Sequence, residues 1–190
     1  MTKKLLLIII FSFSLVGVII VFCLFDWVRS NRTSALDFND CLKSGFIVTE
    51  KIPRECKDGF GKTFIEDLGN ILEKNDLIKL ATPLPNSNNS SPLVITGKAR
   101  GFWFFEGSFP VKLKSLEGKV LASTVATAEG EWMTEDFVEF KADIYFNVSA
   151  PTKVIIELDK DNPSGLSELE DSIMIPIVII PVESTPTISI

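Results

Sequence analysis

The sequence predicts a mainly β protein, a two-sheet antiparallel sandwich that follows a membrane helix and a small cysteine-containing segment. Three observations support this fold class. Short runs of alternating apolar and polar residues, the period of a half-buried strand, fill the chain from Leu93 to about Val182. An uncharged apolar stretch lies near the start, at residues 5–25. Between these regions, Cys41 and Cys56 lie in a short polar segment.

The apolar stretch at residues 5–25 predicts a membrane span. As a helix it would measure about 31 Å, which matches the hydrocarbon core of a bilayer. The alternative is a cleaved signal peptide, but the apolar core of such a peptide runs only about 7–15 residues, and no small-residue cleavage site follows here. Lipoprotein processing would need a small residue before Cys23, where the chain has Phe22. We therefore expect an uncleaved signal-anchor over residues 1–27, with residues 5–25 in the lipid bilayer.

The charges beside this span point in two directions. Lys3 and Lys4 favour a cytoplasmic N-terminus, whereas Arg29 and Arg32 favour the opposite orientation. The cysteine pair that follows is typical of an oxidising compartment. We expect a single-pass protein whose C-terminal domain lies outside the cytoplasm.

Cys41 and Cys56 form an even pair in a short polar region, which indicates a disulfide. Closing a loop of that size would stabilise the fold by about 3 kcal/mol in the chain-entropy model. The alternative is two free thiols in a cytoplasmic protein. A zinc site would need more ligands than two cysteines provide in a chain without histidine.

The segments expected along the chain are a transmembrane signal-anchor (1–27), a spacer (28–40), a two-cysteine module with a short helix (41–81), a linker (82–92), the β-sandwich (93–182) and a tail (183–190). The short helix is predicted over Ile71–Leu80, because apolar residues recur there at loosely helical spacing after Asn70, a residue typical of N-caps. Residues 82–92 are rich in Pro, Asn and Ser, a composition typical of a linker.

The strands of the sandwich are predicted by alternation. The clearest is "FVEFKADIYFNV", and the stretches around "LEGK" predict a hairpin. In "SIMIPIVII" the isoleucines share one face, while Pro176 cannot donate to a ladder and so predicts an edge strand or a bulge. Six or seven short strands in about 90 residues predict two packed sheets. The apolar face of the clearest strand consists of Val138, Phe140, Ala142, Ile144, Phe146 and Val148; that of the last strand consists of Ile173, Ile175, Ile177 and Ile179.

Four consecutive aromatic residues, Phe102 to Phe105, raise a separate question. In a strand they would point alternately to the two faces, so one pair would enter the core and the other would need a cover. The linker, the tail and the loop that contains Trp132 are the candidates for that cover. If the second pair is exposed instead, Trp103, Phe105 and Trp132 form a candidate binding patch for a partner protein or a sugar face.

The stretches "SPLVITGKARG", "FEGSFPVKL", "ATAEGEW" and "FVEFKADIYF" resemble the immunoglobulin-like domain of bacterial spore germination and sporulation proteins, the second type of the Gmad family. The resemblance extends over Ser91 to Val182. It implies a bacterial, extracytoplasmic immunoglobulin-like β-sandwich used for binding or assembly, with no catalytic residues. The segment "CLKSGFIVTEKIPRECKDGFGKTF" resembles a two-cysteine module of small bacterial envelope proteins, which implies a disulfide between Cys41 and Cys56. We expect this region to form a small α+β module.

The chain contains no histidine, which excludes Ser-His-Asp and Cys-His catalysis and imidazole metal sites. Ser44 beside Lys43 and Ser115 beside Lys114 are the candidates for a lysine-activated serine, but their positions in a hairpin and on a strand surface give it no further support. We therefore expect no enzymatic activity and no cofactor.

An acidic stretch is the remaining candidate for metal binding. Its carboxylates could chelate calcium, but the order of an EF-hand loop is broken by Pro163. We expect a solvated acidic loop with a turn at "DNPSG" and no metal. The carboxylates belong to Glu157, Asp159, Asp161, Glu168, Glu170 and Asp171.

The net charge of −6, with no run of basic residues longer than Lys3–Lys4, argues against nucleic acid as a partner. The sequence favours a non-enzymatic, membrane-anchored binding or scaffold protein of the bacterial cell envelope, with an envelope protein or a cell-wall glycan as its partner. The alternatives are a carbohydrate- or peptidoglycan-binding module and, third, a histidine-independent hydrolase.

Overall fold

The computed structural model describes residue 20 and residues 34–182, which fall into two compact units with the boundary between Glu66 and Asp67. No helix in this part of the chain is long and apolar enough to cross a membrane. The span expected at residues 5–25 lies outside the described residues, apart from the helical residue Ile20.

The first unit is a small α+β module, but its bounds differ from those predicted: its helix begins at Phe38, inside the expected spacer, and the unit ends at Glu66 and not at residue 81. Asp37 caps its helix by accepting a hydrogen bond from the Asp40 N–H at 2.8 Å. Cys41 on the helix and Cys56 on the central strand are fully buried and form a disulfide, with 6.1 Å between their Cα atoms. The elements are the helix α2 (Phe38–Lys43) and the antiparallel strands β1 (Ile47–Val48), β2 (Glu55–Lys57) and β3 (Thr63–Ile65), in the order β1-β2-β3.

The second unit contains one eight-stranded sheet in the order β4-β6-β9-β8-β7-β10-β11-β5. Every pair of neighbours is antiparallel except β5 and β11. The strands are β4 (Ile78–Thr82), β5 (Asn88–Asn89), β6 (Leu93–Arg100), β7 (Ser108–Ser115), β8 (Val120–Ala128), β9 (Phe137–Ile144), β10 (Thr152–Asp159) and β11 (Ser172–Ile179), with short 3₁₀ helices at Gly101–Trp103 and Ser167–Leu169.

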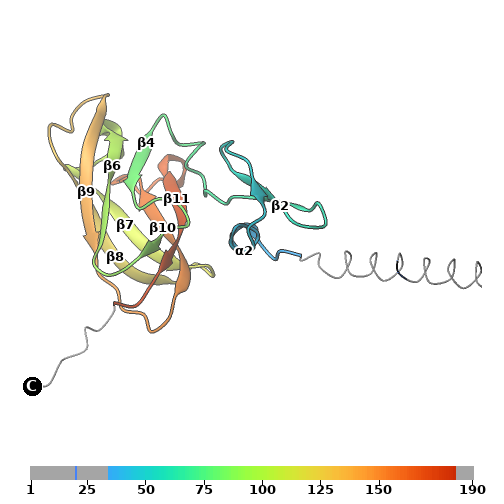
Figure 1. Cartoon of the computed structure of the whole chain (residues 1–190). Helices are drawn as coiled ribbons and strands as arrows, with labels where there is room; N and C mark the ends of the chain where they lie inside the picture. Colours follow the sequence, from blue (N-terminus) through green and yellow to red (C-terminus); the bar gives the residue numbers. More distant parts are fainter. Residues whose placement is uncertain (1–19, 21–33, 183–190) are drawn as a thin grey trace, which may run out of the picture. The chain divides into compact units, whose positions relative to one another are not determined.

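The sheet curls into two layers at β8. This strand pairs with β7 along its length but with β9 only at Thr127 and Ala128. One layer therefore contains β4, β6 and β9, and the other contains β7, β10 and β11 (Figure 1). The two layers of the predicted sandwich are present, although one continuous sheet forms them and not two separate sheets. The pairing of β6 with β9, of β7 with β10 and of β10 with β11 is that of an immunoglobulin-like fold.

Alternate side chains of both layers fill the space between them. Phe109 of β7 meets Phe140 of β9 edge-to-face across the core, with ring centroids 5.0 Å apart. The buried faces predicted for β9 and β11 are confirmed, except that β9 ends at Ile144. Phe146 and Val148 follow the strand and pack against the core from a loop.

The helix predicted over Ile71–Leu80 is wrong. Residues 69–76 form turns, and Ile78, fully buried, begins β4 and pairs with Ala99. The Asn70 C=O accepts hydrogen bonds from the Glu73 and Lys74 N–H groups, and the Lys74 C=O accepts from the Leu77 and Ile78 N–H groups, which closes two successive turns. A helix cannot continue because Ile78 and the residues after it belong to the sheet.

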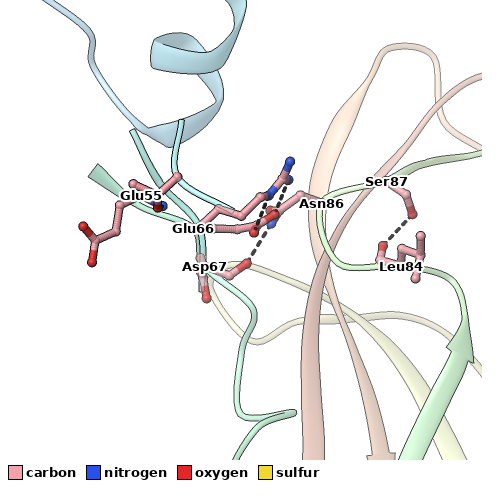
Figure 2. A network of polar contacts seen from close by, with 8 residues as sticks. Glu55, Glu66, Asp67, Leu84, Asn86 and Ser87 are labelled. Atoms are coloured by element: carbon pink, nitrogen blue, oxygen red, sulfur yellow. Dashed lines mark hydrogen bonds and ion pairs between the residues drawn. The ribbon is translucent and has the colours of Figure 1, made fainter. Parts of the chain in front are cut away.

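The linker predicted at residues 82–92 is also wrong, because this segment is part of the second unit. Asn88–Asn89 form β5, and the Asn86 side chain donates to the Asp67 C=O at 2.7 Å. Figure 2 shows this bond beside that of Ser87 Oγ to the Leu84 C=O, at 2.6 Å. The chain therefore passes from one unit to the other at Glu66–Asp67, with no Pro- or Ser-rich spacer.

The edge position predicted for Pro176 is correct only in part: β5 lies outside β11 in the sheet, but β5 pairs with Val178 and Ile179 and not with Pro176. Backbone N and C=O groups of one residue point to the same side of a strand, and the Pro176 C=O accepts from the Asn86 N–H at 2.7 Å. The Pro176 nitrogen therefore faces away from β10. On the same side, Val178 donates to the Ser87 C=O and Ile180 donates to the Asn89 C=O, both at 2.9 Å.

Candidate functional site

The aromatic run does not form a strand. Residues 101–103 form a 3₁₀ helix, in which successive side chains are about 120° apart, so the predicted alternation fails. Trp103 and Phe104, neighbours in sequence, are both buried, whereas Phe102 and Phe105 are exposed. The Trp103 C=O accepts a hydrogen bond from the Asp161 N–H at 3.0 Å, which fixes the helix against the loop after β10.

The candidate patch of Trp103, Phe105 and Trp132 is therefore wrong as a surface. Trp103 lies in the core, and its Nε1 has no hydrogen-bond partner there. Trp132 is half-buried against the core, and its indole ring lies so close to Gly107 that a Cβ there would be 3.3 Å from it. Of the three residues, Phe105 alone is exposed.

A groove of about 700 Å³ lies elsewhere in the second unit. Its base is the outward face of β7, β10 and β11, where Lys112, Glu157 and Met174 lie side by side in one row of the sheet. The remaining walls come from the turn after Asn70 and from the loop between β10 and β11. The lining residues are Asn70, Glu73, Lys74, Pro110, Lys112, Glu157, Asp159, Lys160, Asp161, Asn162, Glu170, Asp171, Ser172 and Met174.

Glu157 is the most buried charge of the groove, at 9 % exposure. Its Oε1 lies 2.5 Å from Lys114 Nζ and 3.7 Å from Lys112 Nζ. Burial would raise the pKa of Glu157, but the hydrogen bond from Lys114 and the nearby charges outweigh it, so that the pKa lies below its usual value. Glu157 is thus held as a carboxylate in the base of the groove.

Asp159 lies two residues further along β10 and bonds Lys112, with Oδ2 at 2.5 Å from Nζ. Burial raises the pKa of Asp159 although Lys112 opposes this, and the neighbouring Glu157 carboxylate raises it further. The bond to Asp159 in turn raises the pKa of Lys112. The base of the groove is therefore a connected network of two lysines and two carboxyl groups.

The rim of the groove is more acidic than its base. Lys74 pairs with Asp171 at 2.6 Å. The carboxylates of Glu73, Asp161 and Glu170 form no ion pair within residues 34–182. Six carboxyl groups and three lysines line the groove, so its net charge is negative.

The acidic stretch considered for calcium contributes all of its carboxylates to this groove except Glu168. No group of carboxylates or cysteines among the described residues has an arrangement that would hold a metal ion. The predicted turn at "DNPSG" is present, with the Gly165 N–H donating to the Asn162 C=O. The candidate Ser–Lys pair at Ser115 is not formed as a dyad, because Lys114 Nζ bonds Glu157.

The strand order and the two-layer core make the second unit an immunoglobulin-like β-sandwich domain. Residues 77–167 match the family described as the immunoglobulin-like domain of bacterial spore germination, which is the family that the sequence resembles. The match includes β4, which the resemblance at Ser91–Val182 left out, and ends before β11. No curated protein and no solved structure matches the chain.

Proposed function

We propose that this protein is a non-enzymatic, membrane-anchored binding protein of the bacterial cell envelope, and that the groove on β7, β10 and β11 binds a basic segment of a partner protein. The observation that carries the proposal is the charge of the groove. Its base is neutralised by lysines, while Glu73, Asp161 and Glu170 at its walls are left for a partner's cations.

The location of the protein rests on its N-terminal half. The apolar stretch at residues 5–25 has the length of a membrane span. The bonded pair Cys41–Cys56 suits an oxidising compartment, since disulfides are rare in the cytosol. Both features support a module that stands outside the cytoplasmic membrane.

A protein partner is favoured over a sugar. Sugar-binding sites present aromatic faces, and Trp103, one of the three aromatic residues of the candidate patch, is buried and cannot contact a sugar. The groove offers carboxylates, three lysines, the thioether of Met174 and Pro110 instead. Charged surfaces of this kind guide and orient protein partners.

Photo-cross-linking in cells tests the groove. A photoreactive amino acid replaces Met174, which lines the groove and is 42 % exposed, or Val94 on β6, which is 41 % exposed and lies outside it. We expect a discrete protein adduct from position 174 alone, and loss of the adduct when Glu170→Lys is added. Equal adducts at both positions, or an adduct that survives the charge reversal, would contradict the proposal. Peptidoglycan retention without a protein adduct would favour the sugar-binding alternative.

Reporter fusions test the location. A periplasmic-type phosphatase fused after Val182 should be active, and a fluorescent protein that folds only in the cytoplasm should be dark. The reverse pattern would place the domain inside the cell.

A further inference from the structure

The second unit protects the edges of its sheet unequally. The β11 edge is occupied by the backbone of residues 86–89 and by Asn70. The β4 edge belongs to a strand of five residues that carries Lys79, contains a register shift and is followed by Pro83. Short length, lysine, irregularity and proline are the devices by which natural sheets block further pairing.

Strand β8 lacks these devices over most of its length. It separates from β9 before Thr127, and the sequence from Val120 to Ala128 contains no charge and no proline. A register shift opposite Lys114 affects only its first residues. The side chains of Val120, Leu121 and Val125 are exposed on this strand.

The hydrogen-bonding pattern identifies which backbone N–H and C=O groups of β8 point away from β7. The Ala128 N–H donates to the Gly107 C=O at 2.8 Å. Because backbone groups alternate in direction along a strand, Ala126 and Thr124 also direct their N–H and C=O groups to β7. Ser123 and Val125 alternate with those residues and direct their N–H and C=O groups away from β7. Thr127 has the same orientation and finds β9, whereas Ser123 and Val125 have no strand beside them among residues 34–182.

We propose that a second copy of this chain pairs with this edge, β8 against β8 in antiparallel orientation, about a two-fold axis at Ser123. The sequence of the strand selects this occupant. Antiparallel pairing about Ser123 places Ser123 opposite its own copy and Leu121 opposite Val125, and the backbone groups of Ser123 and Val125 point toward the copy. Leu121 lies at the register shift and contributes its side chain. An exposed apolar residue thus meets another on the outward face.

Charge supports the same occupant. The chain carries a net charge of −6, so two copies repel each other over most surfaces, but β8 brings no like charges together. An extended segment of a different protein is the other class of occupant. Such a segment need not place a small residue opposite Ser123 or an apolar residue opposite Val125, whereas a second copy of β8 does both. The proposal does not depend on the groove or on the location of the protein.

Sedimentation velocity of the full chain in detergent tests the proposal. We expect a dimer for the native protein and a monomer for Ser123→Lys, which sets two ammonium groups against each other at the axis while its side chain stays on the exposed face. Ser149→Lys, at an exposed loop serine, is the matched control and should remain dimeric. A native monomer would overturn the proposal.

Disulfide trapping separates this interface from association through other segments. In a Cys23→Ser background, Ser123→Cys should give a cross-linked dimer under a mild oxidant, because opposed residues in an antiparallel pair lie within disulfide reach. Ser149→Cys should not. A dimer that persists in Ser123→Lys and gives no cross-link at position 123 would place the interface elsewhere and contradict the proposal.

Discussion

Asn70 pairs with Met174 as a neighbouring strand would. Its Oδ1 accepts the Met174 N–H at 2.7 Å, and its own N–H donates to the Met174 C=O at 3.2 Å. Its Nδ2 also donates to the Ser172 C=O at 2.9 Å. One asparagine thus satisfies three backbone groups on the edge of β11.

We expect Asn70→Ala to lower the free energy of unfolding by about 1–2 kcal/mol, because water replaces these bonds only in part. Asn75→Ala, in the same turn but exposed, should leave stability unchanged. Denaturant titration gives the difference, and amide exchange should be faster at Met174 in the first variant alone. Equal stability of the two variants would show that the edge contacts contribute nothing.

Gly69 allows Asn70 to approach β11. Its φ is +66°, and a Cβ there would lie 1.8 Å from the Met174 carbonyl oxygen. We expect Gly69→Ala to destabilise by more than about 2 kcal/mol, since backbone displacement is added to the left-handed conformation. Gly118→Ala shares the positive φ, but nothing lies within 4 Å of its Cβ, so it should cost about 1–2 kcal/mol. The same loss in both variants would refute the role of close approach.

The Glu157–Lys114 pair predicts a pH dependence. Because folding lowers the pKa of Glu157, its contribution to stability is present above the usual pKa of 4.5 and is lost as the pH falls through the folded value. Glu157→Gln should therefore cost about 2 kcal/mol at pH 7, and the difference from the native protein should shrink toward pH 3.

Asp159 has the opposite sign, since its raised pKa makes its contribution greatest at low pH. This contribution should be smaller in Glu157→Gln, because burial still raises the pKa of Asp159 but the Glu157 carboxylate no longer does. Unfolding free energies measured from pH 7 to pH 3 give the comparison. Glu139→Gln, from the exposed Lys98–Glu139 pair, should change stability by less than about 1 kcal/mol at every pH. A loss in Glu157→Gln that does not vary with pH would contradict the ion pair.

The disulfide should stabilise the first unit selectively. Replacing Cys41 and Cys56 together by serine opens a loop with a sequence separation of 15, which the chain-entropy model values at about 3 kcal/mol. Hydrogen exchange read by mass spectrometry should accelerate across residues 34–66 and stay unchanged across the sandwich. Acceleration throughout the sandwich would show that the two units do not fold separately.

Trp103 should act as a core residue. Trp103→Ala removes a fully buried ring and should cost about 3–5 kcal/mol, whereas Trp103→Phe should cost much less, because the indole Nε1 has no hydrogen bond to lose. Thermal denaturation distinguishes the two. An alanine variant as stable as the native protein would mean that the ring is not in the core.

Alternation was a reliable guide where one face of a strand is buried. It identified β9 and β11 and the hairpin of β7 and β8, since the period of two follows from strand geometry alone. The same rule failed at Phe102–Phe105, because a 3₁₀ helix there depends on the contact of Trp103 with the loop after β10. The four aromatic residues by themselves do not reveal this long-range contact.

The groove shows a similar limit. "VKLKS" and "IIELDK" each display their charges in sequence, but the pairing of β7 with β10 brings Lys112 and Lys114 to Glu157. The roles of Asn70 and of residues 86–89 depend in the same way on β11, about a hundred residues later. Taken alone, the sequence of Ile71–Leu80 predicted a helix and that of residues 82–92 predicted a linker.

The contacts along the outer side of β11 determine which recombinant fragment of this protein should fold. The family match, residues 77–167, contains neither Asn70 nor β11 itself. A recombinant fragment trimmed to those limits would leave β10 bare on one side and remove the four buried isoleucines of β11 from the core, and we expect it to precipitate. A fragment for crystallisation or NMR should begin at Asp67 and extend through Val182.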